Sequence, residues 1–135
     1  MCLLESVTAY DETSIVCTAR DHRDNTHPLR HDGKLPITAG IEYAAQAMAL
    51  HAILTRQNSA VSNTTAMLVQ LSDVHWNCDT LDQHIAPLVI RAEQTNALGN
   101  SASYHFQVLE KAVVLIEGQM LVHFQTDTGN IGSAD

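Results

Sequence analysis

The alternation of apolar and polar side chains predicts two strands at the start of the chain. Residues 3–10 mix β-branched and apolar types, and residues 13–20 (TSIVCTAR) alternate well enough for a second strand. An Asp-Glu pair between them is a turn signal, so the two strands are expected to form a hairpin. Residues 21–34 hold three aspartates, a proline and a glycine without periodicity, which predicts a loop.

A single long helix is predicted to follow this loop. Thr38 is a candidate N-cap residue, and residues 41–54 are rich in alanine, methionine and leucine, which favour helices. The apolar positions cover more than one face, a pattern typical of helices that are buried on most sides. The polar stretch 57–63 (QNSAVSN) is predicted to be a linker that ends the helix.

The second half of the chain is predicted to form four strands. Alternating apolar positions mark residues 66–76, 84–94 and 101–109, and a last strand carries apolar residues on one face up to Phe124. Gly118 within that last strand is expected to mark a bulge or a close approach. Gly-Asn and Glu-Lys turn signals separate the last three strands, which should therefore be antiparallel.

This order of elements predicts an α+β domain in which one curved antiparallel sheet wraps a long central helix. The length of 135 residues suits one domain, and an apolar fraction of 45% is ordinary for a globular core. We expect residues 1–125 to form this single domain. Residues 126–135, which contain Gly and Asp, are expected to form a flexible tail.

The charge of the chain narrows the choice of partners. The formal net charge of −8 argues against a general nucleic-acid binder and against binding to anionic membrane surfaces. Positive charge is nevertheless gathered in one loop, where four of the seven basic residues stand beside three aspartates. These basic residues are Arg20, Arg23, Arg30 and Lys34. The cluster is expected to attract an acidic partner, and a solvated loop of mixed charge is the alternative.

The cysteines and the chain start bear on location. Cys2, Cys17 and Cys78 show no Cys-x-x-Cys spacing, so neither a disulfide framework nor a zinc ribbon is predicted, and a reducing compartment is the simplest interpretation. The N-terminus lacks a basic segment followed by an apolar core. The apolar run after Glu42 is shorter than the roughly 20 residues that cross a bilayer. The sequence therefore predicts a soluble cytoplasmic protein.

One histidine and one carboxylate are the candidate reactive groups. Glu42 opens the helix, and residues 43–55 after it carry no Asp, Glu, Lys or Arg. A carboxylate beside an apolar helix is costly unless it has a partner or a task. His27 lies fifteen positions earlier, and a histidine with a carboxyl group commonly moves protons near neutral pH. A solvent-facing Glu42 that favours the helix dipole, and an ordinary loop His27, are the alternatives.

Other side chains have simpler explanations. The spacings of five and four among His22, His27 and His31 suit a metal site, but the flanking ligand pattern is missing and no metal is predicted. Tyr43 is expected to pack against the sheet or an interface. Trp76 is expected to anchor the core or an interface.

Several blocks of sequence resemble a known family. MCLLESV near the start, HPLRHDGKLP in the loop and GIEYAAQAM on the helix are similar to hotdog-fold 3-hydroxyacyl-(acyl-carrier-protein) dehydratases. The later blocks LVQLSDVHW, PLVIRAEQ and VLIEGQMLVHF agree in style, so the resemblance covers about residues 1–125. The chain looks most like the small dehydratase-like proteins of aryl-polyene and related polyketide-type lipid clusters. The resemblance implies the hotdog fold.

The resemblance also implies a set of site residues. His27 matches the family's catalytic loop histidine, Glu42 its helix carboxylate, and Gln46 the glutamine of its Glu-x-x-x-Gln helix pattern. Gln46 would either hydrogen-bond Glu42 or be a packing residue with a satisfied amide. In the family, the histidine of one protomer faces the carboxylate of the other across a two-fold dimer whose sheets join edge to edge. Backbone amides just before the helix would hold the thioester oxygen. The corresponding residues here are Ile37, Thr38, Ala39 and Gly40.

The implied reaction is the loss of water from a 3-hydroxyacyl thioester to give a trans-2-enoyl product, with His27 as base and Glu42 as acid. The substrate would arrive on the phosphopantetheine arm of an acyl carrier protein, whose acidic surface would meet the basic loop. No other cofactor is implied. The partner in the dimer would be a second copy or a related hotdog subunit.

Two alternatives stay open. A hotdog thioesterase would use a carboxylate to activate water without needing His27. The second alternative is a dehydratase-like subunit that completes the site of an active paralogue. It stays open because the loop reads His27-Pro28-Leu29-Arg30 where the family usually has His-Phe-Pro-Gly.

Overall fold

The computed structural model describes residues 2–55 and 64–126 of the chain. The predicted linker 57–63 lies outside these described residues, as does the predicted tail from residue 127 onward. The described part contains one α-helix, six strands and a short 3-10 helix, η1. In chain order the elements are β1 (Ser6–Tyr10), β2 (Ser14–Ala19), η1 (Asp21–Arg23), α1 (Ala39–Thr55), β3 (Thr64–Trp76), β4 (Leu88–Leu98), β5 (Ser101–Glu110) and β6 (Val113–Thr126).

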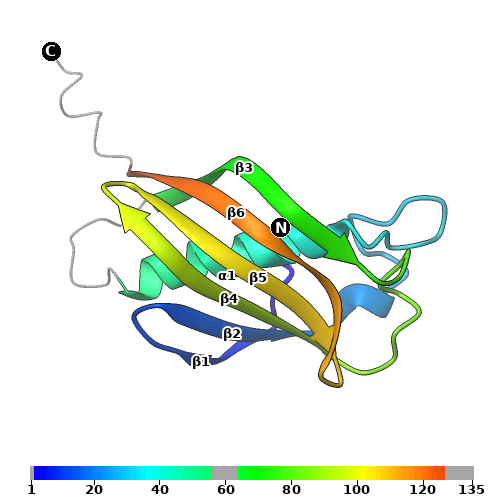
Figure 1. Ribbon diagram of the computed structural model, residues 1–135. Helices are drawn as coiled ribbons and strands as arrows, with labels where there is room; N and C mark the ends of the chain where they lie inside the picture. Colours follow the sequence, from blue (N-terminus) through cyan, green and yellow to red (C-terminus); the bar gives the residue numbers. More distant parts are fainter. Residues whose placement is uncertain (1, 56–63, 127–135) are drawn as a thin grey trace, which may run out of the picture.

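The six strands form one antiparallel sheet in the order β1-β2-β4-β5-β6-β3. Figure 1 shows α1 lying along one face of this sheet, which curves around the helix. Short turns join β1 to β2 and β4 through β5 to β6, whereas β3 joins the sheet at the free side of β6. β1 and β3 are therefore the two edge strands, at the lower and upper margins of Figure 1. The predicted α+β architecture is confirmed.

The face of the sheet that meets α1 carries the core. Every second side chain points toward the helix and is buried along β5, along residues 116–124 of β6 and along the first five residues of β4, as the alternation predicts. These buried residues include Leu88, Ile90 and Ala92 in β4, Tyr104, Phe106 and Val108 in β5, and Ile116, Met120, Val122 and Phe124 in β6. Burying a large apolar side chain stabilises a fold by roughly 1.5–3 kcal/mol, so these rows hold the sheet against α1.

The sheet covers only one side of α1. The buried positions of the helix, among them Tyr43, Ala47 and His51, recur every three or four residues and form one stripe. Glu42 is exposed, and Ile53 keeps 50% of its surface exposed. The prediction of cover on most sides is therefore wrong for the single chain, because the sheet reaches one face alone. Among the described residues, no helix combines the length and the apolar character needed to cross a lipid bilayer.

Two strand limits differ from the prediction. β4 begins at Leu88 rather than near His84, because Pro87 has no amide hydrogen for a ladder and the Ala86 amide donates to Glu110 Oε2 at 3.0 Å. β6 continues through residue 126, so the strand includes the first residue of the predicted tail.

Two glycines mark close approaches. A Cβ on Gly40, in the first turn of α1, would lie 2.7 Å from Cγ2 of Ile116. A Cβ on Gly118 would lie 3.0 Å from Cε2 of Phe106, its partner across the β5–β6 ladder. The close approach predicted at Gly118 is confirmed, and Gly40 allows the helix start to lie directly on the sheet.

Gly40→Ala is expected to destabilise the fold by about 1–2 kcal/mol. Overpacking a buried site costs roughly 1–3 kcal/mol, and the better helix propensity of alanine offsets at most about 1 kcal/mol of this. Urea unfolding followed by circular dichroism measures the loss. In an Ile116→Ala background, which lacks Cγ2, the same substitution should no longer destabilise. An equal loss in both backgrounds would contradict the clash as its cause.

Candidate functional site

The loop between η1 and α1 turns His27 into the protein. The His27 amide donates to the Asp24 carbonyl, and the Arg30 amide donates to the His27 carbonyl, each at 3.1 Å. The amide and the hydroxyl of Thr26 donate to the Asp24 carboxylate and hold its pKa below the usual value. As a result the side chain of His27 has no exposed surface.

Both ring nitrogens of His27 have partners within the chain. Nδ1 accepts a hydrogen bond from the Leu29 amide at 3.1 Å. Nε2 lies 3.0 Å from the Tyr43 hydroxyl and 3.4 Å from Oδ2 of Asp21. Since Nδ1 is an acceptor, the neutral ring carries its proton on Nε2 and donates it toward Tyr43 and Asp21.

Tyr43 and Asp21 complete a buried network around His27. The Tyr43 hydroxyl, from the first turns of α1, donates to Oδ1 of Asp21, from η1, at 2.5 Å. Burial is the main reason why the pKa of Tyr43 is raised above its usual value, and the hydrogen bond and charge of Asp21 add to it. Tyr43 is therefore a buried core residue that also links the imidazole to a carboxylate.

Glu42 points away from this network. It is exposed on the side of α1 that the sheet leaves uncovered, and in the described part of the chain no hydrogen bond or ion pair joins it to His27. Its Oε2 lies 3.5 Å from Nε2 of Gln46, at the outer limit of a hydrogen bond. The Leu3 amide donates to Oε1 of Gln46 at 2.8 Å and fixes that side chain.

The segment before α1 leaves one backbone amide open. The amides of Ile37, Ala39 and Gly40 donate to backbone carbonyls at 2.9 Å and are unavailable to a substrate. Among the described residues, nothing accepts a hydrogen bond from the Thr38 amide. Of the four residues predicted for the oxyanion region, Thr38 is thus the one with a free donor at the start of the helix.

The predicted basic cluster divides into two parts. Arg20, Arg23 and Lys34 are exposed, and Arg20 forms an ion pair of 3.2 Å with a glutamate of the N-terminal segment. Arg30 is instead held inside its loop, where the guanidinium donates to two backbone carbonyls at 2.7 and 2.6 Å. Its side chain keeps only 14% of its surface exposed. Three of the four residues therefore present their charge to solvent.

Two hollows border the site. An open cleft of about 490 Å³ lies between η1 and the N-terminal segment, and Asp21 lines it. A more apolar groove of about 420 Å³ shares part of the N-terminal segment with the cleft and follows α1 from Gln46, one turn past Glu42. The side chains along this groove include Leu4, Val7, Gln46, Leu50 and Ile53.

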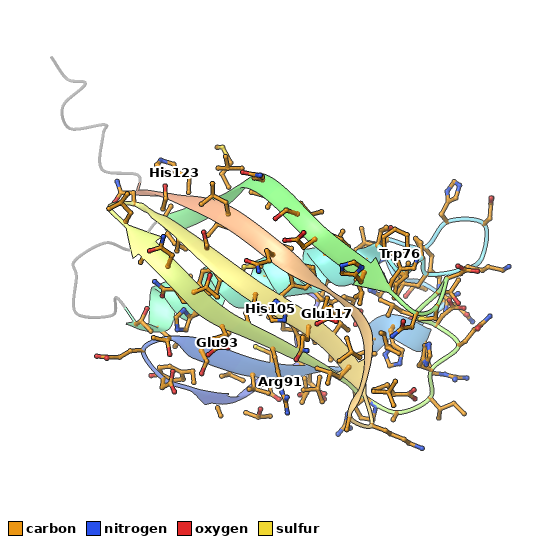
Figure 2. The ribbon with its side chains drawn as sticks, in the orientation of Figure 1. Trp76, Arg91, Glu93, His105, Glu117 and His123 are labelled. Carbon is orange, nitrogen blue, oxygen red and sulfur yellow. The ribbon has the colours of Figure 1, made fainter. Side chains whose placement is uncertain are left out.

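The edge strand β3 exposes apolar side chains on the same face of the sheet as α1. Leu68 and Leu71 pair with buried residues of β6 and so point to the helix side, yet 42% and 36% of their surfaces are exposed. Trp76, labelled at the end of β3 in Figure 2, is 52% exposed. Of its two predicted roles, anchoring the core is therefore wrong, and anchoring an interface stays a prediction. Proteins normally cover an edge strand of this kind.

The histidines considered as metal ligands have separate surroundings. Nε2 of the buried His22 donates to the His84 carbonyl at 2.7 Å, His27 belongs to the network above, and His31 is exposed. Over residues 2–55 and 64–126, no three metal-ligating side chains gather into a possible site.

The buried His22 is expected to make stability depend on pH. Burial lowers its folded-state pKa, so the unfolded chain binds more protons. The charge of Arg23 acts in the same direction, whereas the hydrogen bond to His84 and the charges of Asp21 and Glu110 oppose it without cancelling it. The stabilisation is complete above the unfolded value near 6.5 and is lost as the pH falls below it, by up to about 1.4 kcal/mol per pH unit. Urea unfolding between pH 5 and 8 should show this slope. His22→Gln should flatten it, whereas the same change at an exposed histidine should not.

Comparison with known proteins identifies the family. A model of the ApeP-like family, described as ApeP dehydratase, matches residues 1–131. The chain belongs to the ApeP-like dehydratase family. A search of curated proteins finds no match.

Solved structures agree on the fold. The dehydratase heterocomplex ApeI:P from Xenorhabdus doucetiae contains a similar chain with a TM-score of 0.79 and 22% identity, over 99% of this chain and 90% of that one. A thioesterase from Haemophilus influenzae is similar with a TM-score of 0.62 and 16% identity, over 89% of this chain and 77% of that one. The predicted hotdog fold is confirmed by these likenesses.

Two members of the buried network were not predicted from the sequence. Asp21 entered the sequence analysis only as a charge in the basic loop, and Tyr43 only as a packing residue. A signal for Tyr43 was present, because neighbouring helix residues point about 100° apart and a solvent-facing Glu42 turns Tyr43 inward. No periodicity in the loop marked Asp21, whose place depends on how η1 meets α1.

Proposed function

We propose that this chain takes part in the dehydration of 3-hydroxyacyl thioesters carried by an acyl carrier protein, as one subunit of a hotdog dimer. The observation that carries the proposal is the position of Glu42 in a member of a dehydratase family. Its carboxylate stands at the start of α1, exposed on the helix face that the sheet leaves uncovered. A second chain can approach a carboxylate in that position and enclose it.

The reaction requires two proton transfers and a donor for the thioester oxygen. A base takes the Cα proton, an acid protonates the departing hydroxyl, and water leaves the trans-2-enoyl thioester. By family resemblance, His27 and Glu42 match the histidine and the carboxylate of this scheme. The free amide of Thr38 is the candidate donor for the thioester oxygen, where negative charge develops. The substrate is carried on phosphopantetheine, and the reaction itself needs no further cofactor.

The second subunit would bind along β3. Edge-to-edge pairing there would cover the exposed Leu68 and Leu71 together with the open side of α1. The similar heterocomplex of X. doucetiae supports a related hotdog subunit as the partner, with a second copy of this chain as the other possibility.

The hollows suggest a path for the substrate. Arg20 and Arg23 line the open cleft, and with Lys34 they offer positive charge to an acidic carrier protein. The phosphopantetheine arm would lie in this cleft. The acyl chain would lie in the apolar groove that follows α1 past Gln46 toward Ile53.

The test is a product assay. The chain is incubated with a 3-hydroxyacyl-acyl-carrier-protein, alone and co-purified with a hotdog dehydratase subunit, and the acyl group is analysed by mass spectrometry. Loss of one water with the thioester intact supports the proposal. Release of free thiol would instead identify a thioesterase, and an unchanged substrate in both preparations would contradict the proposed function.

The carrier-docking role has its own readout in the same assay. Arg23→Glu should raise KM for the carrier-bound substrate more than KM for a short thioester analogue, because only the carrier protein meets the loop. Arg30→Glu is not a useful second variant for this test, because the guanidinium of Arg30 holds the loop together through its hydrogen bonds. Equal changes in the two KM values would remove the docking role.

A further inference from the structure

We propose that Asp21, Tyr43 and the Leu29 amide hold His27 as a hydrogen-bond donor, so that this chain supplies Glu42, and not His27, to a composite dehydratase site. The base would be the loop histidine of a different hotdog subunit. This inference rests on the proposed function and names the partner of that same site.

The first step concerns the lone pairs of His27. A base must offer an unprotonated nitrogen, and a neutral imidazole has one. Here that nitrogen is Nδ1, and the Leu29 amide already donates to it at 3.1 Å. The other nitrogen, Nε2, carries the proton and donates to Tyr43 at 3.0 Å. No nitrogen of this ring is left to take a proton from a substrate.

The second step concerns access. The side chain of His27 has no exposed surface, whereas the Asp21 side chain keeps 32% of its surface exposed and lines the open cleft. A substrate in the cleft therefore meets the carboxylate of Asp21 before the imidazole. Reaching His27 would break its bonds to both Tyr43 and Leu29 and leave buried polar groups without partners, at a cost of about 1–3 kcal/mol for each group.

Glu42 has the opposite surroundings. Its side chain is exposed, and Gln46 at 3.5 Å is its nearest described hydrogen-bond partner. The Leu3 amide holds the Gln46 side chain in place, so Gln46 can orient the carboxylate of Glu42. The carboxylate keeps oxygen lone pairs for a substrate. The carboxyl group can therefore turn toward a histidine and a substrate brought by another chain.

The two observations together select the kind of partner. In a dimer of two identical chains, each Glu42 would face a histidine that has no free lone pair. A related hotdog subunit with an open loop histidine would give one working site per pair. At that site the partner's histidine takes the Cα proton, Glu42 protonates the hydroxyl, and water leaves. The imidazolium then loses its proton to solvent and Glu42 regains one, which restores both groups.

The enzymatic test uses the complex of this chain with the ApeI subunit of X. doucetiae. Glu42→Gln should lower kcat by at least about 100-fold, the scale of one lost proton transfer. His27→Gln, in a complex of unchanged mass and at a temperature where both variants are folded, should keep at least about ten times the activity of the Glu42→Gln complex. Glu93→Gln is the matched control, because Glu93 lies on the sheet face turned away from α1 (Figure 2).

Assays of the same complex can also contradict the inference. A His27→Gln complex as inactive as the Glu42→Gln complex would overturn the inference, and so would turnover by the chain alone that depends on His27. If neither the chain nor any complex dehydrates the substrate, the proposed function itself fails, which is a separate result.

A spectroscopic test needs no partner and no turnover. Nitrogen-15 NMR of the chain at neutral pH should show His27 with a protonated Nε2 and an unprotonated Nδ1. Tyr43→Phe should change the Nε2 signal by removing its nearest acceptor, while the signals of the exposed His31 stay in place. An unprotonated Nε2 in the wild-type chain would overturn the inference regardless of any activity measurement.

Discussion

A lysine in place of Leu68 is expected to prevent this chain from pairing with a second hotdog subunit. Leu68 points to the helix side of β3 and is 42% exposed, so an edge-to-edge partner would bury it. Placing an ammonium group in an apolar interface costs several kcal/mol, and each 1.4 kcal/mol is a tenfold change in Kd. We expect Kd to rise by at least about 100-fold, measured by analytical ultracentrifugation.

The control for this substitution is Leu98→Lys. Leu98 is 81% exposed next to the β4–β5 turn. A lysine at this position therefore adds the same charge to the surface outside the proposed interface. It should leave Kd unchanged. If Leu68→Lys and Leu98→Lys proteins associate equally well, the subunits do not meet along β3. Dehydration should fall in parallel with association, since in the proposed site Glu42 meets the histidine of the second chain.

The strands were predictable because one face of each meets a single helix. Alternation placed Leu88 and Ile90 in β4, and Tyr104 and Phe106 in β5, on the buried face, where they are found. A period of two is forced on any strand that has a core on one side and solvent on the other. The start of β4 was missed because the Ala86 amide bonds to a glutamate side chain far away in the sequence.

The helix shows the limit of the same reasoning. Its composition predicted burial on most sides, and the structure leaves Glu42 and Ile53 open. The apolar residues of a sequence include those buried inside its own fold and those buried by another chain. The excess of apolar residues on α1 therefore agrees with the exposed Leu68 and Leu71 of β3, and both fit the second subunit proposed above.

The sequence named candidate residues for the site but did not predict its geometry. Family resemblance selected His27 and Glu42, but the chain alone places one inside and the other outside. Their separation follows from helix geometry at Glu42 and Tyr43, and from the amide of Leu29, whose donor role depends on how the loop turns. Hydrogen-bond direction of this kind has no signature in a single sequence. The direction of these hydrogen bonds decides whether His27 can act as a base, and only a three-dimensional structure reveals it.

Tyr43→Ala is expected to produce the largest loss of stability of any substitution in the site, about 3–5 kcal/mol. Tyr43 is fully buried, so its removal leaves a cavity in the core beside His27 and Asp21. It also removes the hydroxyl between His27 and Asp21, whose remaining direct contact is 3.4 Å. Because whole domains have about 5–15 kcal/mol of stability, this loss removes a large share of the free energy of unfolding and should lower the urea midpoint strongly. Urea unfolding of the wild type and the variant measures the difference.

Tyr43→Phe separates the hydroxyl from the ring. The phenylalanine fills the same space, so its cost of about 1–3 kcal/mol reports the lost hydrogen bonds alone. Asp21→Asn weakens the same bond from the other side, and the two substitutions together should cost less than the sum of their separate costs, because they share one interaction. Strictly additive losses would mean that the hydroxyl of Tyr43 does not depend on Asp21. In that case Tyr43 and Asp21 would not act as one network beside His27, and the Leu29 amide alone would fix the donor direction of its ring.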